Sequence, residues 1–119
     1  SSMIGVVAQR LVRKLCDNCK EEYEIPESVL IDTGLPPGTT AWKPVGCDVC
    51  RTTGYKGRSA IFEIMRVDDM IQSLILEGAS ANRIRKEAVS RGMKTLRQSG
   101  MRKVTDGLTS LEEVLQVSL

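Results

Sequence analysis

Four cysteines are the residues of this sequence whose type and spacing predict chemistry. Cys16 and Cys19 form one C-x-x-C pair, and Cys47 and Cys50 form a second, with 27 residues between the pairs. Two residues between cysteines let the chain turn so that both sulfurs face one ion. Two such pairs complete a closed tetrahedral shell of thiolates, which suits Zn²⁺ and leaves no position for a reacting water. We therefore predict a structural zinc site and not a hydrolytic one.

Other uses of the four cysteines stay open. Two disulfides are one alternative, because four cysteines allow three pairings, and iron is another, because an S₄ tetrahedron also accepts it. A thioredoxin-type redox pair is disfavoured, because Cys16 follows a predicted helix and not a strand of a βαβ unit. Four buried thiols without a metal are disfavoured by polar neighbours, namely Asp17, Asn18, Asp48 and Arg51. The simplest interpretation is a cytoplasmic, reducing compartment, and paired cysteines there more often bind metal than form disulfides.

The composition limits what this chain can do alone. It contains no histidine, so it has no Ser–His or Cys–His catalytic pair. The run Gly92-Met93-Lys94-Thr95 resembles the end of a phosphate-binding P-loop, but Met93 stands where a glycine must precede the lysine. The run also follows a predicted helix, so we interpret Gly92 as the residue that ends this helix. We therefore do not expect the chain by itself to be an enzyme.

Charge and hydropathy argue against nucleic acid and membrane as partners. The 119 residues include 17 Lys and Arg and 15 Asp and Glu, a net charge of +2, and the two signs are interleaved. A duplex-binding domain usually concentrates its basic residues. No apolar run approaches the roughly 18–20 residues of a membrane span, and the N-terminal run lacks the basic start of a signal peptide. We interpret the basic residues near the cysteines as a solvated face: Arg13, Lys14, Lys20, Arg51, Lys56 and Arg58.

The elements that hold the cysteines are predicted from periodicity. Apolar residues at positions 4, 7, 8, 11, 12 and 15 follow helical spacing, so we predict a helix over residues 1–15. Residues 16–57 hold all four cysteines and all four prolines, and we predict irregular structure there apart from a short helix over 26–33. Such a segment has little apolar area to bury, so a metal is needed to stabilise it. The run 59–65 predicts a short strand.

The second half of the sequence predicts four short helices. Asp68 and Ser80 are the expected N-caps of the first two, each of which a glycine ends. A third helix spans about 95–105, and an S-x-x-E capping box from Ser110 to Glu113 opens the fourth. The expected fold class is therefore mostly α: an N-terminal helix, an irregular tetracysteine zinc-binding subdomain with one short strand, and a small C-terminal helical bundle.

Three segments of the sequence resemble a known family. Residues 8–19 read AQRLVRKLCDNC, and residues 47–63 read CDVCRTTGYKGRSAIFE. Both resemble signatures of the bacterial type II secretion ATPases, also called general secretion pathway protein E, and of the related type IV pilus assembly ATPases. Residues 92–114 are similar to the C-terminal part of the same family, so the resemblance covers nearly the whole chain.

The resemblance implies a division of the chain. In that family these segments follow a RecA-like core that binds ATP and Mg²⁺, and the Walker A, Walker B, Asp-box and His-box motifs of that core are absent here. The resemblance implies residues 1–15 as a helix from the end of the core, 16–66 as a tetracysteine metal-binding subdomain and 67–119 as a C-terminal helical subdomain. It also implies that the metal ligands are Cys16, Cys19, Cys47 and Cys50. By the same resemblance, Arg10 and Arg13 would face a subunit boundary.

The resemblance also implies a cellular setting. The parent proteins are hexameric cytoplasmic motors at the bacterial inner membrane, and they hydrolyse ATP to assemble a pilus or a pseudopilus. This chain would then be the C-terminal third of such a motor. Its expected partners are the inner-membrane platform protein or a cytoplasmic adaptor, without insertion into the membrane. Whether the parent serves secretion or pilus assembly stays open.

A free-standing zinc-ribbon module that binds nucleic acid is the alternative function. Trp42 and Tyr55 offer rings that could stack on bases, although isolated aromatic residues beside a metal site more often serve packing. Salt-dependent binding to single-stranded nucleic acid would favour this alternative. Binding to the cytoplasmic domain of a pilus platform protein would favour the motor.

Overall fold

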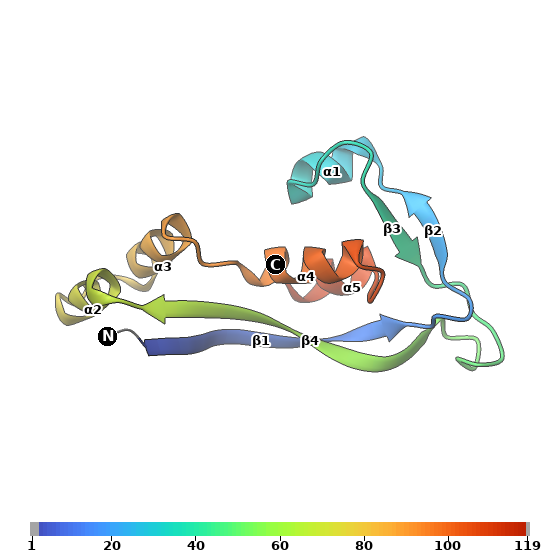
Figure 1. The fold of residues 1–119 in the computed structure, drawn as a ribbon, viewed down its shortest axis with the longest axis horizontal. Coiled ribbons are helices and arrows are strands. Elements are labelled where there is room, and N and C mark those ends of the chain that lie inside the picture. Colours follow the sequence, from blue (N-terminus) through green and yellow to red (C-terminus); the bar gives the residue numbers. More distant parts are fainter. Residues whose placement is uncertain (1–2, 119) are drawn as a thin grey trace.

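A long two-stranded ribbon organises the fold. The computed structural model describes residues 3–118 and, within them, every side chain except those of Ile4 and Val6. Strand β1 (Met3–Leu15) pairs antiparallel with strand β4 (Tyr55–Val67), from Met3 opposite Val67 to Leu15 opposite Tyr55. The molecule measures 55 × 29 × 21 Å, and the ribbon follows its longest dimension (Figure 1).

Strand β1 corrects our prediction of an N-terminal helix. Residues 3–15 are a strand, and the first two residues of the predicted helix lie outside the described range. Residues four apart share a face in a strand as well as in a helix, so the apolar spacing fits both. Leu11 is 53% exposed and Val12 only 1% exposed, as expected for neighbours on opposite faces of a strand. Pairing with β4 outweighs the helix propensity of the segment, and a bulge between Val6 and Ala8 adjusts the register.

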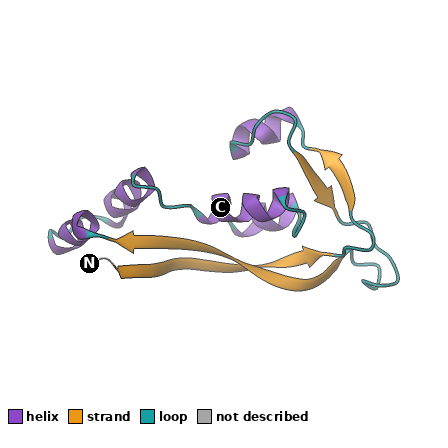
Figure 2. Cartoon of the chain, viewed as in Figure 1, coloured by secondary structure: helices purple, strands orange, loops and turns teal. Residues whose placement is uncertain are grey.

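A second strand pair stands apart from the ribbon. Strand β2 (Glu21–Glu24) pairs antiparallel with β3 (Thr40–Lys43), and helix α1 (Glu27–Thr33) lies in the connection between them (Figure 2). Helix α1 confirms the predicted helix over 26–33. The sequence does not predict β2 and β3, because each has only four residues, too few for a clear alternation, and β2 is rich in glutamate.

Four helices follow β4, as predicted. They are α2 (Asp69–Leu76), α3 (Ala81–Ser90), α4 (Leu96–Thr105) and α5 (Leu111–Val117). The N-cap side chains of all four accept a backbone hydrogen bond from the first helical turn, and these caps are Asp68, Ser80, Thr95 and Ser110. The described residues form five helices and four strands, so the fold mixes α and β structure and is not mostly α.

The larger apolar core joins α4 and α5 to the middle of the ribbon and to the β2–β3 unit. It includes residues from each of the three predicted parts of the chain, such as Val12, Ala41 and Val104, which are at most 1% exposed. Helices α4 and α5 approach closely at Gly100, where an added Cβ would lie 2.4 Å from Cγ1 of Val114. A side chain at this position would push the two helices apart.

A smaller core lies at the end of the ribbon where β4 ends. Ile71 and Leu74 of α2 and Ala88 of α3 are its buried members, and Met65 and Val67 of β4 pack against it. The cysteine turns lie at the opposite end, so the ribbon separates two differently built regions (Figure 1).

Candidate metal centre

Two turns bring the four cysteines together at one end of the ribbon. Cys16 directly follows β1, and its turn closes where the amide of Lys20 donates to the carbonyl oxygen of Cys16 at 3.0 Å. The second turn lies between β3 and β4, where the amide of Thr52 donates to the carbonyl oxygen of Cys47 at 2.8 Å. The amide of Cys16 also donates to the carbonyl oxygen of Gly54 at 3.0 Å, which ties the two turns together.

Two glycines allow the second turn to form. Gly46 and Gly54 have positive φ angles of 111° and 82°. A Cβ on Gly54 would lie 2.4 Å from the Cβ of Pro44, and one on Gly46 would lie 2.8 Å from the carbonyl oxygen of Thr52. Larger residues at either position would therefore displace the turn for two reasons, backbone conformation and lack of space.

The four sulfur atoms form a compact cluster. All of them lie within 4.8 Å of one another, and Cys16 and Cys50 are buried. The Sγ atoms of Cys16 and Cys47 are 3.7 Å apart, and those of Cys19 and Cys50 are 3.8 Å apart. Sulfurs arranged as a tetrahedron around a metal, with bonds of about 2.3 Å, are about 3.8 Å from one another. The donor set and its spacing therefore fit one tetrahedral metal ion.

Hydrogen bonds to two of the sulfurs favour their thiolate form. The side-chain amide of Asn18 donates to Sγ of Cys47 at 3.2 Å, and this bond, with neighbouring backbone amides, lowers the pKa of Cys47 to about 6. Burial acts to raise the pKa of Cys50, but backbone amides, including that of Gly54 at 3.1 Å, outweigh it and the pKa is lowered. The thiolate is the form of cysteine that binds metals.

Cys19 behaves differently from its neighbours. The amide of Gly46 donates to its Sγ at 3.3 Å and favours the thiolate, but burial and the adjacent thiols raise the pKa of Cys19 to about 11. Negative charges this close repel one another, so the four sulfurs cannot all be deprotonated without a cation. The cluster therefore has the electrostatic character of a cation site.

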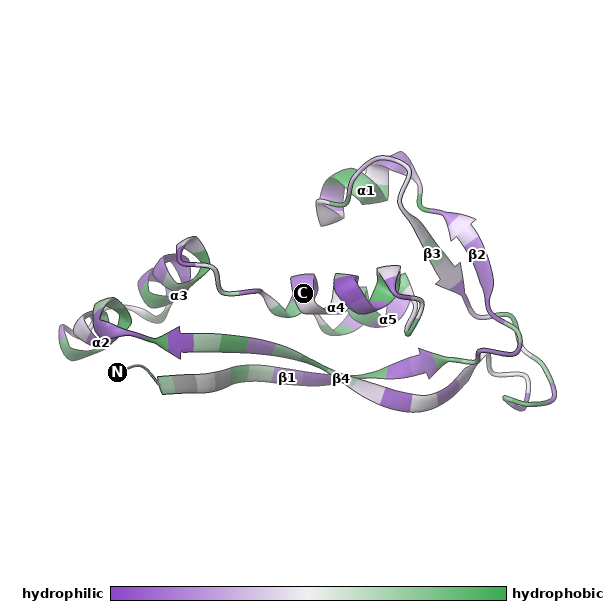
Figure 3. Cartoon of the chain, viewed as in Figure 1, coloured by the Kyte–Doolittle hydropathy of each residue, from purple (hydrophilic) through white to green (hydrophobic). Residues whose placement is uncertain are grey.

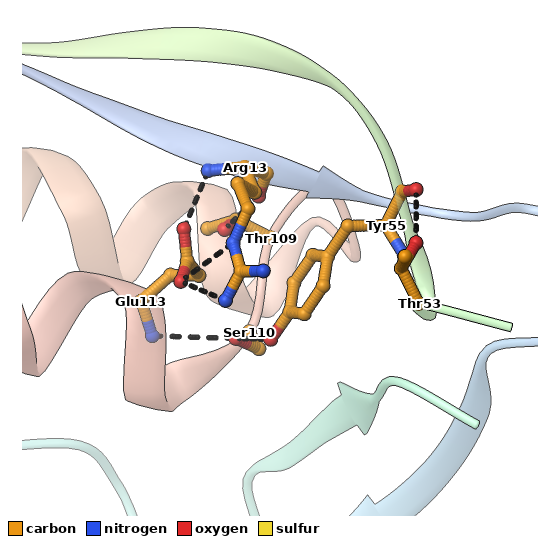
Figure 4. Close-up of polar contacts among 6 residues, drawn as sticks. All are labelled: Arg13, Thr53, Tyr55, Thr109, Ser110 and Glu113. Atoms are coloured by element: carbon orange, nitrogen blue, oxygen red, sulfur yellow. Dashed lines mark hydrogen bonds and ion pairs between the residues drawn. The ribbon is translucent and has the colours of Figure 1, made fainter. Parts of the chain in front are cut away.

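Contacts of Arg13, which we call the Arg13 joint, connect the end of β1 before the first cysteine turn to α5 (Figure 4). The Glu113 carboxylate accepts the backbone amide of Arg13 at 2.6 Å and its guanidinium at 3.0 Å. The guanidinium also lies over the Tyr55 ring, 4.1 Å from the ring centre, and the Tyr55 hydroxyl is 2.7 Å from the hydroxyl of Ser110. The Thr109 hydroxyl donates to the carbonyl oxygen of Arg13 at 2.6 Å. These contacts fix the end of β1 immediately before the cysteines.

Only one of the two hydrogen bonds of the predicted capping box at Ser110 is present. The Ser110 hydroxyl accepts the amide of Glu113 at 3.3 Å, but the Glu113 carboxylate binds Arg13 and does not return to the cap. Burial acts to raise the pKa of Glu113, and the bonds from Arg13 outweigh it, so the pKa is lowered. A complete capping box occurs instead at Thr95 and Gln98. Sequence reasoning misses the Arg13–Glu113 pair because 100 residues separate its members.

The remaining candidate residues of the sequence differ in their contacts. The Trp42 ring lies near the Lys20 ammonium, 5.7 Å from its centre, and Arg13 covers Tyr55, which supports the packing interpretation of both rings. Arg10 is exposed on β1 and forms no ion pair within the described residues. Gly92 follows α3 with a φ of 103°, so the helix-end interpretation of this residue is confirmed.

Comparisons with known proteins identify the family. The sequence model of the family described as type II/IV secretion system protein matches residues 1–116. The chain belongs to this family. This secretion-system chain is 48% identical over 120 residues to the type IV pilus assembly ATPase PilB of Myxococcus xanthus, and the match covers 97% of the chain and 21% of that relative.

Two further relatives represent both branches of the family. The secretion-system chain is 45% identical over 119 residues to the type IV pilus assembly ATPase PilB of Thermus thermophilus, covering 97% of the chain and 13% of the relative. It is 41% identical over 118 residues to type II secretion system protein E of Dickeya dadantii, covering 99% and 24%. The chain thus spans a quarter or less of the length of these relatives.

These comparisons confirm the resemblance drawn from the motifs. They place the chain among secretion and pilus proteins, and the relatives include both kinds. Within residues 3–118, no helix has the length and apolar character needed to cross a membrane.

Proposed function

We propose that this chain is the C-terminal metal-binding and helical part of a hexameric motor ATPase for type II secretion or type IV pilus assembly. The observation that carries the proposal is a compact four-cysteine cluster in a chain similar over nearly its whole length to a pilus assembly ATPase. ATP and Mg²⁺ bind in the RecA-like core of the parent, and the present chain has structural and partner-contact roles. In this division, residues 1–15 end the core, 16–66 bind metal and 67–119 form the helical part.

The metal in this proposal is zinc, and its ligands are Cys16, Cys19, Cys47 and Cys50. Zn²⁺ supplies no reaction here: it offsets the thiolate charge and cross-links two turns that lack an apolar core of their own. Structural zinc stabilises small zinc-finger peptides by about 10–16 kcal/mol, which is ample for a segment of this size. The four protein ligands leave no coordination position for a substrate, so the proposed site is structural.

The partner in this proposal is the inner-membrane platform protein or a cytoplasmic adaptor of the same machine. The cysteine turns lie at one extremity of a molecule 55 Å long, where they can reach a partner without disturbing the α4–α5 core (Figure 1). The proposed location is the cytoplasm, peripheral to the bacterial inner membrane.

Metal analysis of the purified chain tests the site. We expect about one Zn per chain, and we expect Cys47→Ser to lose it. Val49→Ser is the matched control, because Val49 lies in the same turn, is 50% exposed and offers no sulfur. A chain with two disulfides and no metal would overturn the zinc site. About one Fe per chain would keep the four ligands and overturn zinc as their metal.

A binding experiment tests the role. We expect the zinc-loaded chain to bind the cytoplasmic domain of a platform protein or the adaptor, and we expect Cys47→Ser to bind less. Salt-dependent binding to single-stranded DNA, together with no binding to either protein, would instead favour the nucleic-acid module.

A further inference from the structure

A basic groove lies beside the last part of β4, away from the cysteines. It has a volume of about 1150 Å³ and is lined mainly by β4, α4 and the connection from α3 to α4, which runs alongside β4 in Figure 1. Residues 33–35 at the end of α1 and single residues of α2 and α3 also contribute to the lining. Of the 17 basic residues of the chain six line this groove, and of the 15 acidic residues only two do. The groove therefore carries a net charge of +4, whereas the rest of the chain carries −2.

Most of the groove's positive charge is not neutralised by residues 3–118. Two of the six cations form ion pairs with the two aspartates: Arg91 with Asp68 at 2.7 Å and Arg102 with Asp106 at 3.6 Å. The other four form no ion pair within the described part of the chain, and they are Arg66, Lys94, Arg97 and Lys103. Unpaired cations gathered on one surface attract an anionic partner.

The groove also has an apolar wall. Alternate residues of a strand share a face, and Phe62, Ile64 and Arg66 line the groove whereas Ile61 and Glu63 are buried on the other side. Phe62 is 37% exposed and Ile64 is 45% exposed. Figure 3 shows hydrophobic and hydrophilic bands alternating on this part of β4. The partner must therefore offer apolar groups as well as negative charge.

One edge of β4 is free in this groove. The ribbon contains only β1 and β4, so the second edge of β4 pairs with no strand of the described residues. Helix α4 covers the start of this edge, where the Ser99 hydroxyl accepts the amide of Phe62 at 3.3 Å and Lys103 donates to the carbonyl oxygen of Ala60 at 2.6 Å. The backbone N–H and C=O groups that point to this edge belong to every second residue. After Phe62, the next residue with such groups is Ile64, and α4 leaves them uncovered. A free edge is a template for an added strand.

We propose that this groove binds an extended acidic segment of a partner protein, which adds a strand to β4 along residues 64–67. Backbone hydrogen bonds to the edge at Ile64 fix its register, and its apolar side chains contact Phe62 and Ile64. Its carboxylates pair with Arg66 and Lys94. A protein segment fits better than a nucleic acid, because the free strand edge and the aliphatic wall match a peptide backbone and apolar side chains. The proposal is independent of the metal site.

The probe is a synthetic peptide of about ten residues that alternates glutamate and valine, except that glutamate also replaces the valine opposite Arg66, because Arg66 shares the face of Phe62 and Ile64. We expect saturable ¹⁵N chemical-shift changes at residues 62–67 and 94–103 of the 119-residue chain, and slower amide exchange at Ile64. Arg66→Glu with Lys94→Glu should weaken binding by about tenfold or more. Arg83→Glu with Lys86→Glu is the matched control, because it makes the same charge change at exposed positions of α3 outside the groove and should leave the affinity nearly unchanged.

Three results would overturn the proposal. Two peptides, each methylated on one of the two alternating sets of backbone nitrogens, test strand addition, because only one set can face β4. Binding of both as tightly as the parent peptide would exclude strand addition. Equal weakening by the two double variants would reduce the interaction to general charge attraction. Shifts at the same residues with oligo-dT or with phosphatidylglycerol vesicles, and none with the peptide, would assign the groove to nucleic acid or to lipid.

Discussion

The two ends of the β1–β4 ribbon are stabilised in different ways. At one end, two turns with few apolar side chains converge on four sulfur atoms within 4.8 Å of one another. At the other end, α2 and α3 bury Ile71, Leu74 and Ala88 against the last residues of β4. Short turns cannot bury enough apolar area to hold their shape, whereas two amphipathic helices can. One ribbon therefore carries two regions whose stabilities depend on unrelated chemistry.

Both ends nevertheless contain the same arrangement, a buried glutamate that accepts hydrogen bonds from an arginine and from a backbone amide. Near the cysteine end, Glu113 is 8% exposed and binds the guanidinium and the amide of Arg13. Towards the helical end, Glu63 is 5% exposed and binds the guanidinium of Arg85 and the amide of Leu96, at 2.9 and 2.8 Å. Each glutamate connects the ribbon to the helices, so the joints are similar although the regions beyond them differ.

Loss of the metal should have the largest effect and should be confined to one end. We expect Cys16→Ser, or a chelator, to abolish amide-exchange protection over residues 16–57 while α2 and α3 keep theirs. The physical reason is that the turns lose their cross-link, whereas the core of Ile71 and Leu74 has no contact with the sulfurs. Residue-resolved hydrogen exchange is the measurement.

Val49→Ser controls for a polar change in the same turns and should leave the exchange pattern intact. Uniform loss of protection along the whole chain after chelation would contradict the independence of the two ends. The larger core also includes Ile25, Leu30 and Ala41, so a modest loosening of α4 and α5 is consistent with the prediction.

Leu74→Ala should produce the reverse pattern. Leu74 is 5% exposed in the smaller core, and truncation of a buried leucine costs about 2–5 kcal/mol. We expect α2 and α3 to lose exchange protection while the zinc content of the chain stays unchanged. Leu76→Ala is the matched control, because Leu76 lies in the same helix and is 81% exposed. If Leu74→Ala also released zinc, the two ends would have to be coupled through the ribbon.

The same contrast explains what could be predicted from the sequence. The caps at Asp68 and Ser80 form hydrogen bonds between residues three apart, so a local sequence pattern predicts them. The C-x-x-C spacing of each cysteine pair is likewise a local pattern. The joints at Glu63 and Glu113 depend on residues 22 and 100 positions away, which no local pattern contains. Strand β1 is missed for a similar reason, since only its pairing with β4 separates a strand from a helix there.

Replacing the two buried glutamates should cost less than either change above. Glu113→Gln and Glu63→Gln each remove a charge-assisted hydrogen-bond acceptor, which is worth about 1.5–3 kcal/mol. We expect Glu63→Gln to loosen the start of α4 and its link to α3, and Glu113→Gln to loosen α5 and the end of β1. Chemical denaturation and residue-resolved hydrogen exchange together measure both effects. Glu112→Gln, an exposed neighbour of Glu113, is the control, and an equal loss there would refute a specific role for the joint.

Asp68→Asn should have the smallest effect, and it should appear only as a change in pH dependence. The Asp68 carboxylate accepts the amide of Ile71 at 3.0 Å and pairs with Arg91 at 2.7 Å, so its pKa lies below the ordinary value of 3.8. Because the folded pKa is depressed, this stabilisation is fully present above about pH 4 and is lost as the pH falls through the folded pKa.

Asparagine still caps α2 but cannot pair electrostatically with Arg91. The exchange stabilities of α2 in the two proteins should therefore differ at neutral pH and converge in acid. Asp69→Asn is the control, because it removes the same charge from the first turn of α2 at an exposed residue that does not pair with Arg91, so it should change the profile less than Asp68→Asn. Parallel profiles for the parent and Asp68→Asn would show that the Arg91 pair adds nothing to the helical end, which would then depend on its apolar core alone.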